Sequence, residues 1–322
     1  MTDMKIGNRV AVTGCAGFIG SNLTERFLKE GRHVVGVDNF FTGSRRNLPR
    51  GELAGNFTFI EADITREGRW QNELAGCDTT FHMAAYPEAG AGEKDTEVHL
   101  KHNVIGTRNV LDGSAKKGRN IVFASSSTVY GEAAKMPTPE DYGPLKPIGI
   151  MGASKLGCEG YVAAYCHVFD AEGGIMRFAN VVGRHEAHGV TYDFVRKLKQ
   201  NPSELRIIGR DPGTVKSYVH IDDLMDGIMA GCARAVDRVE IYNVGTGQVT
   251  SVHELADIVA SEMGLKGVSY KWTGGVDNGR GWKEDVKLMK LSVEKLKSRG
   301  WVAKLSSAEA IALTVRELLQ EL

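Results

Sequence analysis

The stretch Val10-Ala-Val-Thr-Gly-Cys-Ala-Gly-Phe-Ile-Gly20 decides the fold of this chain. A short apolar strand comes first, glycines spaced Gly-x-x-Gly-x-x-Gly then turn the chain tightly, and a helix follows from about Ser21. The apolar run at residues 33–38 forms a second strand and completes a β-α-β unit. Glycines let the backbone approach a pyrophosphate, and a helix N-terminus attracts its negative charge. This order therefore predicts a dinucleotide-binding domain.

The chemistry of this unit favours NAD as the cofactor. Asp38 ends the second strand, where a carboxylate accepts hydrogen bonds from the adenosine ribose and repels the 2′-phosphate of NADP. Arg45 and Arg46 would soften that preference unless they lie on a solvated loop. The glycine spacing differs from Gly-x-Gly-x-x-Gly, so the alternative is a tight turn that binds no ligand. The strand before the glycines, the helix after them and the acid at the end of the next strand all argue against that alternative. The residues expected to contact NAD here are Gly14, Gly17, Phe18, Ile19, Gly20, Asp38 and Asn39.

The composition is that of an ordinary globular chain. Its 322 residues are 42% hydrophobic and 25% charged, enough for one large core or two modest ones. Forty basic residues balance forty acidic ones, so the chain lacks the basic footprint expected of a protein that binds nucleic acid or an anionic membrane. A small molecule is therefore the expected partner.

The N-terminus and the cysteines indicate a cytoplasmic protein. Residues 1–8 are polar, and no apolar run approaches the roughly 20 residues needed to span a bilayer, so we expect neither a signal peptide nor a membrane span. The five cysteines are scattered, odd in number and without metal-ligand spacing. They are typical of reduced thiols, and we expect no metal site.

Three further strands are expected to extend the sheet, at residues 57–64, 78–85 and 120–131. At the end of the first, Asp63 and Ile64 are placed to meet an adenine edge, although Asp63 also fits the N-cap of a helix over residues 65–74. At the end of the second, the residues expected to lie close to the cofactor are Met83, Ala84 and Ala85. His82 alone is more typical of a satisfied strand-end histidine than of a catalyst.

Hydroxyl groups follow the third of these strands. Side chains at the carboxyl end of a parallel sheet face the ligand crevice, and four are expected there: Ser125, Ser126, Ser127 and Thr128. Before this strand, a helix over residues 95–117 places Asn103 where it can bond backbone near the cofactor. After it, a helix over residues 150–168 places Met151 and Lys155 on one face, four residues apart.

Beyond residue 172 the pattern changes and predicts a second unit. Strands are expected at 174–183, 205–208, 217–221 and 239–244, and helices at 192–200, 222–235, 251–263 and 308–322, with Thr250 or Ser251 capping the third of these helices. We predict an α/β fold: a Rossmann-like, doubly wound parallel sheet over residues 1–178, with returning segments near 215–247. A smaller α/β substrate domain is expected from 179–214 and 248–322. The crevice between them is the expected site.

Four segments together resemble the extended short-chain dehydrogenase/reductase family, specifically its nucleotide-sugar epimerases and dehydratases: residues 13–20, 82–85, 125–131 and 152–155. Segments 123–131, 178–183, 188–194 and 277–282 are most similar to archaeal-type UDP-glucose and UDP-galactose 4-epimerases. The resemblance covers essentially the whole chain. It implies a tightly held NAD that takes a hydride from sugar C4, after which the 4-keto sugar rotates and receives the hydride on its other face.

The resemblance also assigns roles to single residues. It implies that Ser126 is the catalytic serine/threonine and that Lys155 bonds the nicotinamide ribose and brings positive charge into the site. Lys216 stands where relatives have a diphosphate-binding arginine. The lysine ammonium is a point charge and cannot form the bidentate contact of a guanidinium. Arg280 is then the remaining diphosphate clamp, unless it is a solvated loop arginine. The residues expected to contact a UDP-sugar are Tyr86, Ser126, Ser127, Thr128, Asn180, Tyr192, Lys216 and Arg280.

Met151 departs from the family pattern. Relatives place a tyrosine there, and its phenolate takes the proton of the sugar hydroxyl as the hydride leaves. A thioether has no proton to exchange and accepts hydrogen bonds weakly. Losing a positioned acid–base group typically costs about 10²–10⁴ in rate, unless another group takes over.

Three interpretations of Met151 are open. In the first, Ser126, Tyr86, or a water held by Ser127 and Thr128 supplies the proton path of an epimerase. In the second, the chain is a UDP-sugar dehydratase with a Ser-Met-Lys site, since some UDP-N-acetylglucosamine 4,6-dehydratases also have methionine at this place. In the third, it is a non-catalytic homologue that binds NAD and a UDP-sugar.

The dehydratase interpretation has a test in the sequence. Elimination of water needs an acid and a base near C5 and C6, and many dehydratases place Asp-Glu where this chain has Ser127-Thr128. Glu88 could reach the site, although a loop or helix-start residue is the simpler interpretation. We therefore rank an epimerase of a UDP-hexose or UDP-hexuronate first. The resemblance also implies a homodimer through the helices at 95–117 and 150–168, unless those faces are buried within the monomer.

Overall fold

A parallel sheet of seven strands forms the centre of the molecule, and its order is β11-β6-β5-β4-β1-β2-β3. The structure is a computed structural model and describes residues 6–232 and 237–322. In chain order the strands of this sheet are β1 (Arg9–Thr13), β2 (His33–Asp38), β3 (Phe57–Glu61), β4 (Thr79–His82), β5 (Asn120–Ser126), β6 (Gly173–Phe178) and β11 (Val239–Val244). The sheet confirms the predicted α/β, doubly wound fold.

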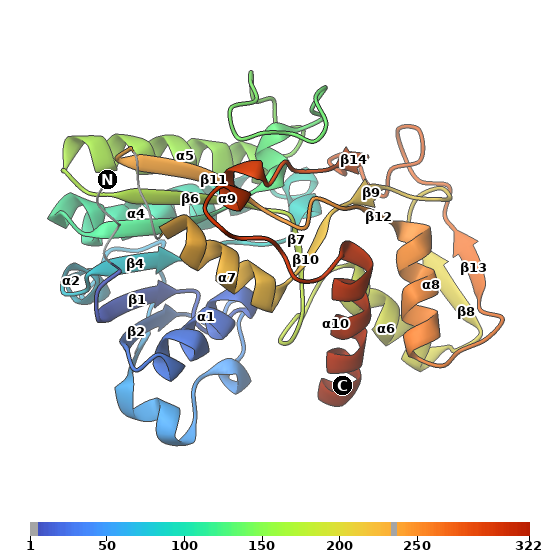
Figure 1. Cartoon of the computed structure of the whole chain (residues 1–322), viewed down its shortest axis with the longest axis horizontal. Helices are drawn as coiled ribbons and strands as arrows, with labels where there is room; N and C mark the ends of the chain where they lie inside the picture. The colour runs from blue at the N-terminus through green and yellow to red at the C-terminus, as the bar shows by residue number, and fades with distance from the viewer. Residues whose placement is uncertain (1–5, 233–236) are drawn as a thin grey trace.

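Helices cover both faces of this sheet (Figure 1). One face packs against α1 (Phe18–Lys29) and α7 (Ile221–Cys232), and the other against α2 (Trp70–Ala75), α4 (Gly106–Gly113) and α5 (Ile150–Val168). Alternate strand residues enter the two cores, as the two-residue period of a strand requires. In β1, Val10 and Val12 belong to the core beside α1, whereas Ala11 belongs to the core beside α4 and α5.

The order of the strands reverses beside β1. The chain passes from β1 outward through β2 to β3, and then returns to the other side of β1 with β4. The loops at the carboxyl ends of β1 and β4 therefore diverge and leave a crevice, which is where ligands bind in sheets of this kind.

The C-terminal elements extend from the centre to the right of Figure 1. They are β7 (Asn180–Val182), α6 (Val190–Gln200), β8 (Glu204–Ile207), β9 (Val215–Lys216), β10 (Tyr218–His220), β12 (Thr250–Ser251), α8 (Val252–Glu262), β13 (Ser269–Trp272), β14 (Leu288–Met289), α9 (Glu294–Lys297) and α10 (Ser307–Glu321). Helices α6, α8 and α10 share a third hydrophobic core. Ser251 caps α8 through a capping box with Glu254, which decides between the two predicted caps.

Several predicted elements are shorter than expected. The helix predicted over 65–74 begins only at Trp70, because Asp63 instead closes a turn by accepting from the Thr65 amide at 2.9 Å. The strand predicted over 120–131 ends at Ser126, and residues 127–130 form the 3₁₀ turn η6. The strand predicted over 174–183 is divided into β6 and β7. Of the helix predicted over 222–235, positions 233–235 lie outside the described residues.

The helix predicted over 95–117 is present but irregular. Its segments are α3 (Thr96–His99), the π-helical turn η4 (Leu100–Ile105), α4, and the 3₁₀ turn η5 (Ala115–Lys117). The remaining 3₁₀ turns are η1 (Arg45–Asn47), η2 (Gly51–Asn56) and η3 (Ala89–Glu93). Across residues 6–232 and 237–322, no helix combines the length and the apolar character needed to cross a bilayer.

Candidate active site

A cavity of about 820 Å³ opens at the carboxyl ends of the central strands. Its lining includes the glycine turn after β1, the ends of β2, β4 and β5, the start of α5, and segments of the C-terminal elements. It is therefore continuous from the predicted cofactor residues to the predicted substrate residues.

The glycine turn has the geometry of a phosphate cradle. Gly14 has a φ of +72°, and a Cβ there would lie 2.8 Å from the backbone of Ala84. A Cβ on Gly20 would overlap the carbonyl oxygen of Gly14. Helix α1 has Gly17 as its N-cap, which has no capping side chain, so the first N–H groups are left for an anion. These residues fit the pyrophosphate of a dinucleotide.

Asp38 lies at the end of β2 and lines the cavity. Its Oδ2 accepts a hydrogen bond from the Ala16 amide at 2.9 Å, and its Oδ1 accepts from the Phe40 amide at 2.7 Å. The carboxylate is thus held in place with lone pairs to spare for a ribose diol. Arg45 is 65% exposed and pairs with Glu61 at 2.7 Å, so it lies on a solvated loop, one of the two predicted alternatives.

The hydroxyls after β5 have distinct partners. Ser125 donates to Glu159 at 2.5 Å, so its proton is used inside the protein. Ser126 accepts from both the amide and the hydroxyl of Thr128, at 3.2 and 3.0 Å. Since both of these bonds use its lone pairs, the Ser126 proton is available to an acceptor in the cavity.

Lys155 and Met151 both line the cavity from α5. The Lys155 ammonium is buried, donates to the Ala124 carbonyl at 2.7 Å and lies 4.8 Å from the centroid of the Phe123 ring. Burial lowers the pKa of Lys155 to about 8. The Met151 side chain offers neither a proton nor a charge, so no acid–base group stands at this position.

His82 and Asn103 support the site from behind. Each ring nitrogen of His82 contacts a threonine hydroxyl, and burial, together with the charge of Lys155, lowers its pKa to about 3. His82 is thus the satisfied strand-end histidine that was expected. Asn103 does not line the cavity; its Oδ1 accepts from the Tyr86 amide at 2.8 Å, and its Nδ2 donates to Ser154 at 2.9 Å. Asn103 therefore bonds the backbone of a cavity-lining residue, as predicted, and its own side chain is not part of the lining.

Two predicted substrate residues also lie off the cavity. The Arg280 guanidinium donates to the Glu132 carboxylate and to the Asp285 carbonyl oxygen, which keep it from the lining. Tyr192 packs against the third hydrophobic core, within α6. Lys216 does line the cavity, but its ammonium pairs with the buried carboxylate of Asp285. The two predicted diphosphate cations are therefore both engaged by acidic groups.

The remaining predicted residues come together on the lining: Gly14, Gly17, Phe18, Ile19, Gly20, Asp38, Asn39, Asp63, Ile64, Met83, Ala84, Ala85, Tyr86, Ser125, Ser126, Ser127, Thr128, Met151, Lys155, Asn180 and Lys216. Asn180 has a buried Nδ2 without a hydrogen-bond partner in the described part of the chain. Such a donor at a cavity wall is placed for a ligand acceptor.

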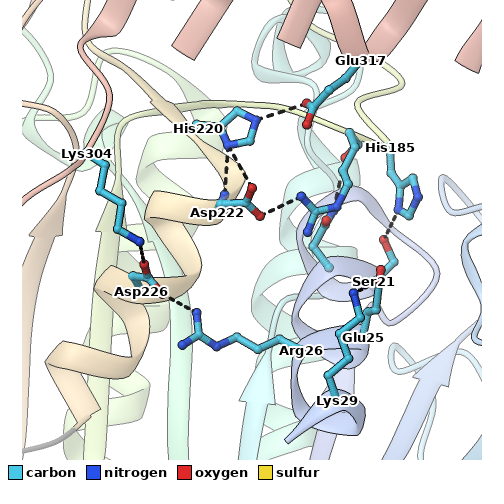
Figure 2. Close-up of polar contacts among 12 residues, drawn as sticks. Ser21, Glu25, Arg26, Lys29, His185, His220, Asp222, Asp226, Lys304 and Glu317 are labelled. Carbon is cyan, nitrogen blue, oxygen red and sulfur yellow. Dashed lines mark hydrogen bonds and ion pairs between the residues drawn. The ribbon is translucent and has the colours of Figure 1, made fainter. Parts of the chain in front are cut away.

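The loop at residues 185–189 also lines the cavity, and only its last two residues lie in a segment that the sequence singled out. Figure 2 shows its His185 against Ser21 of α1, with 3.0 Å between Nδ1 and Oγ. Burial raises the pKa of Glu186 well above its ordinary value and lowers the pKa of His188, so both neutral forms are favoured. The signal that could have found this loop is its run of polar residues directly after a strand.

A second unpredicted part of the lining is the segment 281–286, which includes Trp282, Glu284 and Asp285. The Glu284 Oε1 accepts from the amide of Ile150, the first residue of α5, at 3.1 Å. Nothing in the local pattern of residues 277–290 predicts that contact, because its two partners are 134 positions apart.

Known proteins share this architecture. Residues 10–245 match the model of the NAD dependent epimerase/dehydratase family. The UDP-glucose 4-epimerase of Mycolicibacterium smegmatis is 33% identical over 270 residues, which cover 80% of this chain and 83% of that protein. The structure of Thermus thermophilus UDP-glucose 4-epimerase complexed with NAD has a TM-score of 0.83 at 28% identity, covering 98% of this chain and 100% of that one. The structure of Thermotoga maritima UDP-glucose 4-epimerase with UDP-glucose has a TM-score of 0.84 at 29% identity, covering 97% and 99%.

Proposed function

Because this chain belongs to the NAD dependent epimerase/dehydratase family, as its motifs predict, we propose that it is a UDP-sugar 4-epimerase acting through transient oxidation of C4. Its substrate is a UDP-hexose or UDP-hexuronate. The observation that supports this best is the single cavity that runs from the glycine turn, past Ser126 and Lys155, to Asn180 and Lys216. When bound, NAD supplies the hydride acceptor.

The residues that would hold NAD follow from the geometry. The glycine turn and the N-terminus of α1 would bind the pyrophosphate, and Asp38 the adenosine ribose. The backbone at Ala84 passes close to the turn at Gly14 and narrows the cleft there. Lys155 would bond the nicotinamide ribose, and its charge would favour electron flow toward a hydride acceptor.

Ser126 would act on the sugar itself. Its hydroxyl proton is available because both of its other hydrogen bonds come from Thr128. It can donate a hydrogen bond to the oxygen on C4 and so position C4 for hydride transfer. Asn180, with its unpartnered Nδ2, and Lys216 would meet the diphosphate of the nucleotide.

A UDP-sugar dehydratase is the second candidate function. Glu88 lines the cavity, and the phenol of Tyr86 donates to its carboxylate at 3.3 Å. A carboxylate and a phenol at one wall are groups that elimination of water requires. The positions where many dehydratases have Asp-Glu hold Ser127 and Thr128, which favours the epimerase.

Product analysis by NMR separates these functions. The purified protein is incubated with UDP-glucose, UDP-galactose, their N-acetyl forms and UDP-glucuronate. We expect interconversion at C4 with one of them. A 4-keto-6-deoxy product would show a dehydratase, and tight binding without turnover would show a non-catalytic homologue.

We also propose a cytoplasmic homodimer. The five cysteines are free, buried thiols, as suits a reducing compartment. Exposed apolar side chains lie on the helical segments that the family resemblance implicates, namely Leu100, Ile105, Tyr161 and Val168. Analytical ultracentrifugation should show a dimer, and a Leu100→Asp, Tyr161→Asp variant should sediment as a monomer. A monomeric wild-type protein would contradict the dimer.

A further inference from the structure

The proposed epimerase lacks the group that takes a proton from the sugar hydroxyl, because Met151 stands where the family has a tyrosine. Tyr86 lines the cavity, but burial and the neighbouring Glu88 raise its pKa, so its phenol is held protonated and is a poor base. The other bases on the lining are the imidazoles of His102, His185 and His188 and a set of carboxylates, one of which contacts the residue before Met151.

Two carboxylates of the lining have a buried oxygen that no described group bonds: Glu186 through its Oε2 and Glu284 through its Oε2. Among the described residues, none of the other lining carboxylates has a buried oxygen without a partner; these are Asp38, Asp63, Glu88, Asp193 and Asp285. A buried carboxylate oxygen without a partner is costly, so either of the two groups would gain from a hydrogen-bond donor that a ligand brought within reach.

Their positions distinguish them. Glu186 follows His185, which contacts Ser21 near the N-terminus of α1, so it belongs to the phosphate end of the cavity. Glu284 accepts from the amide of Ile150, the residue before Met151. Its carboxylate therefore lies at the first residue of α5, which precedes Lys155 by about 1.4 turns of helix.

We propose that Glu284 is the acid–base group of this site and replaces the missing tyrosine. The inference rests on the proposed function. Two glycines make room for the carboxylate: a Cβ on Gly149 would lie 3.0 Å from the Glu284 Cβ, and a Cβ on Gly92 would lie 3.2 Å from its Oε1. The Glu284 side chain thus reaches from a C-terminal segment to the same helix that presents Lys155.

The reaction balances with this residue. The Glu284 carboxylate takes the proton of the C4 hydroxyl while the hydrogen on C4 leaves with its electron pair to the nicotinamide, and the C4–O bond becomes a carbonyl. After the sugar turns, the hydride returns to the other face of C4. The carboxyl proton then goes back to the oxygen, so Glu284 ends each cycle as it began.

A purely structural role for Glu284, as the N-terminal cap of α5, is the alternative to catalysis. That role uses only one oxygen of its carboxylate. The Oε1 atom bonds the Ile150 amide, and N-cap Gly149 has no side chain to do so. A Glu284→Gln variant keeps that acceptor through its amide oxygen while it removes the base. Its thermal unfolding and its dissociation constant for UDP, measured by calorimetry, should therefore stay close to those of the wild type.

The experiment compares steady-state kinetics for the interconverted UDP-sugar. We expect Glu284→Gln to lower kcat by about 10²-fold or more, with KM changed less than threefold. The double variant Met151→Tyr, Glu284→Gln should have a kcat at least tenfold higher than that of Glu284→Gln alone. The matched control is Glu93→Gln, because Glu93 is 51% exposed and its carboxylate lies 3.8 Å from the Lys283 ammonium; its kcat should be unchanged.

The outcomes separate the two proposals. If the wild type interconverts no UDP-sugar, the proposed function fails. If the wild type is active and Glu284→Gln retains its kcat, Glu284 is not the base. A larger loss of kcat in Glu88→Gln than in Glu284→Gln would also overturn the assignment, since it would identify Glu88 as that group.

Discussion

The guanidinium of Arg177 on β6 and the carboxylate of Glu159 on α5 form a buried bidentate ion pair, with distances of 2.7 and 2.9 Å. The same carboxylate accepts a hydrogen bond from the Ser125 hydroxyl. Side-chain exposure is 3% for Arg177 and 6% for Glu159. The pair therefore connects the end of β5, where Ser126 precedes the 3₁₀ turn η6, to the helix that presents Lys155.

Breaking this pair should destabilise the whole fold. Glu159→Gln leaves the Arg177 charge buried without its partner, so we expect unfolding to become easier by about 3–5 kcal/mol in urea denaturation. The control is Glu61→Gln, which removes the ion pair with Arg45. The side chains of that pair are 65% (Arg45) and 56% (Glu61) exposed, so the free energy of unfolding should fall by less than about 1 kcal/mol. Equal losses in the two variants would contradict the account of the buried pair.

Activity should fall as the pH rises past the pKa of Lys155, which burial lowers to about 8. Above that pH the ammonium loses its proton and its positive charge, so kcat/KM should decline in a pH–rate profile. Lys155→Met should be inactive at every pH while it still folds.

Stability should respond in the opposite direction. Between about pH 8 and the ordinary lysine value of 10.5, the unfolded chain holds a proton on Lys155 that the folded chain has released. Stability should thus rise with pH across this window in the wild type, relative to Lys155→Met. If the denaturant midpoints of the wild type and of Lys155→Met changed equally with pH across this window, the predicted contribution of Lys155 to stability would be contradicted.

Asp38 should set the preference for NAD over NADP. Asp38→Asn weakens the hydrogen bonds to the ribose, so the affinity for NAD should fall about 10-fold or more. It also removes the charge that repels a 2′-phosphate, so the affinity for NADP should rise. Fluorescence titration of both cofactors measures this. Arg45→Ala should leave the ratio unchanged, and a change there would show that the loop arginine sets the preference.

Met151→Tyr alone should change kcat less than tenfold. If Glu284 already moves the proton, a phenol at position 151 duplicates a group that the site has. Steady-state kinetics of the single variant test this. A hundredfold gain in kcat would contradict it, since it would mean that the native site lacks an acid–base group.

Local pattern was sufficient for the dinucleotide half of the site. The glycine turn and Asp38 lie within 29 consecutive residues, and strand and helix periods position them. The four-residue spacing of Met151 and Lys155 likewise put both on one face of α5, and both line the cavity. These features depend on residues that are close together in the sequence, so a local sequence pattern is enough to predict them.

Long-range partners explain what the sequence did not predict. Arg280 was expected to clamp a diphosphate, but it is held by Glu132, 148 positions away. Glu284 was not predicted as a site residue because its contact with Ile150 spans 134 positions.

The fate of the hydrogen on C4 tests the central claim most directly. Incubation with UDP-[4-²H]glucose in ordinary water, followed by NMR of the UDP-galactose formed, reports whether the hydride returns to the carbon that it left. We predict that the product keeps its deuterium at C4. Epimerisation with loss of that deuterium to water, or no C4 epimer from any UDP-sugar, would contradict the account.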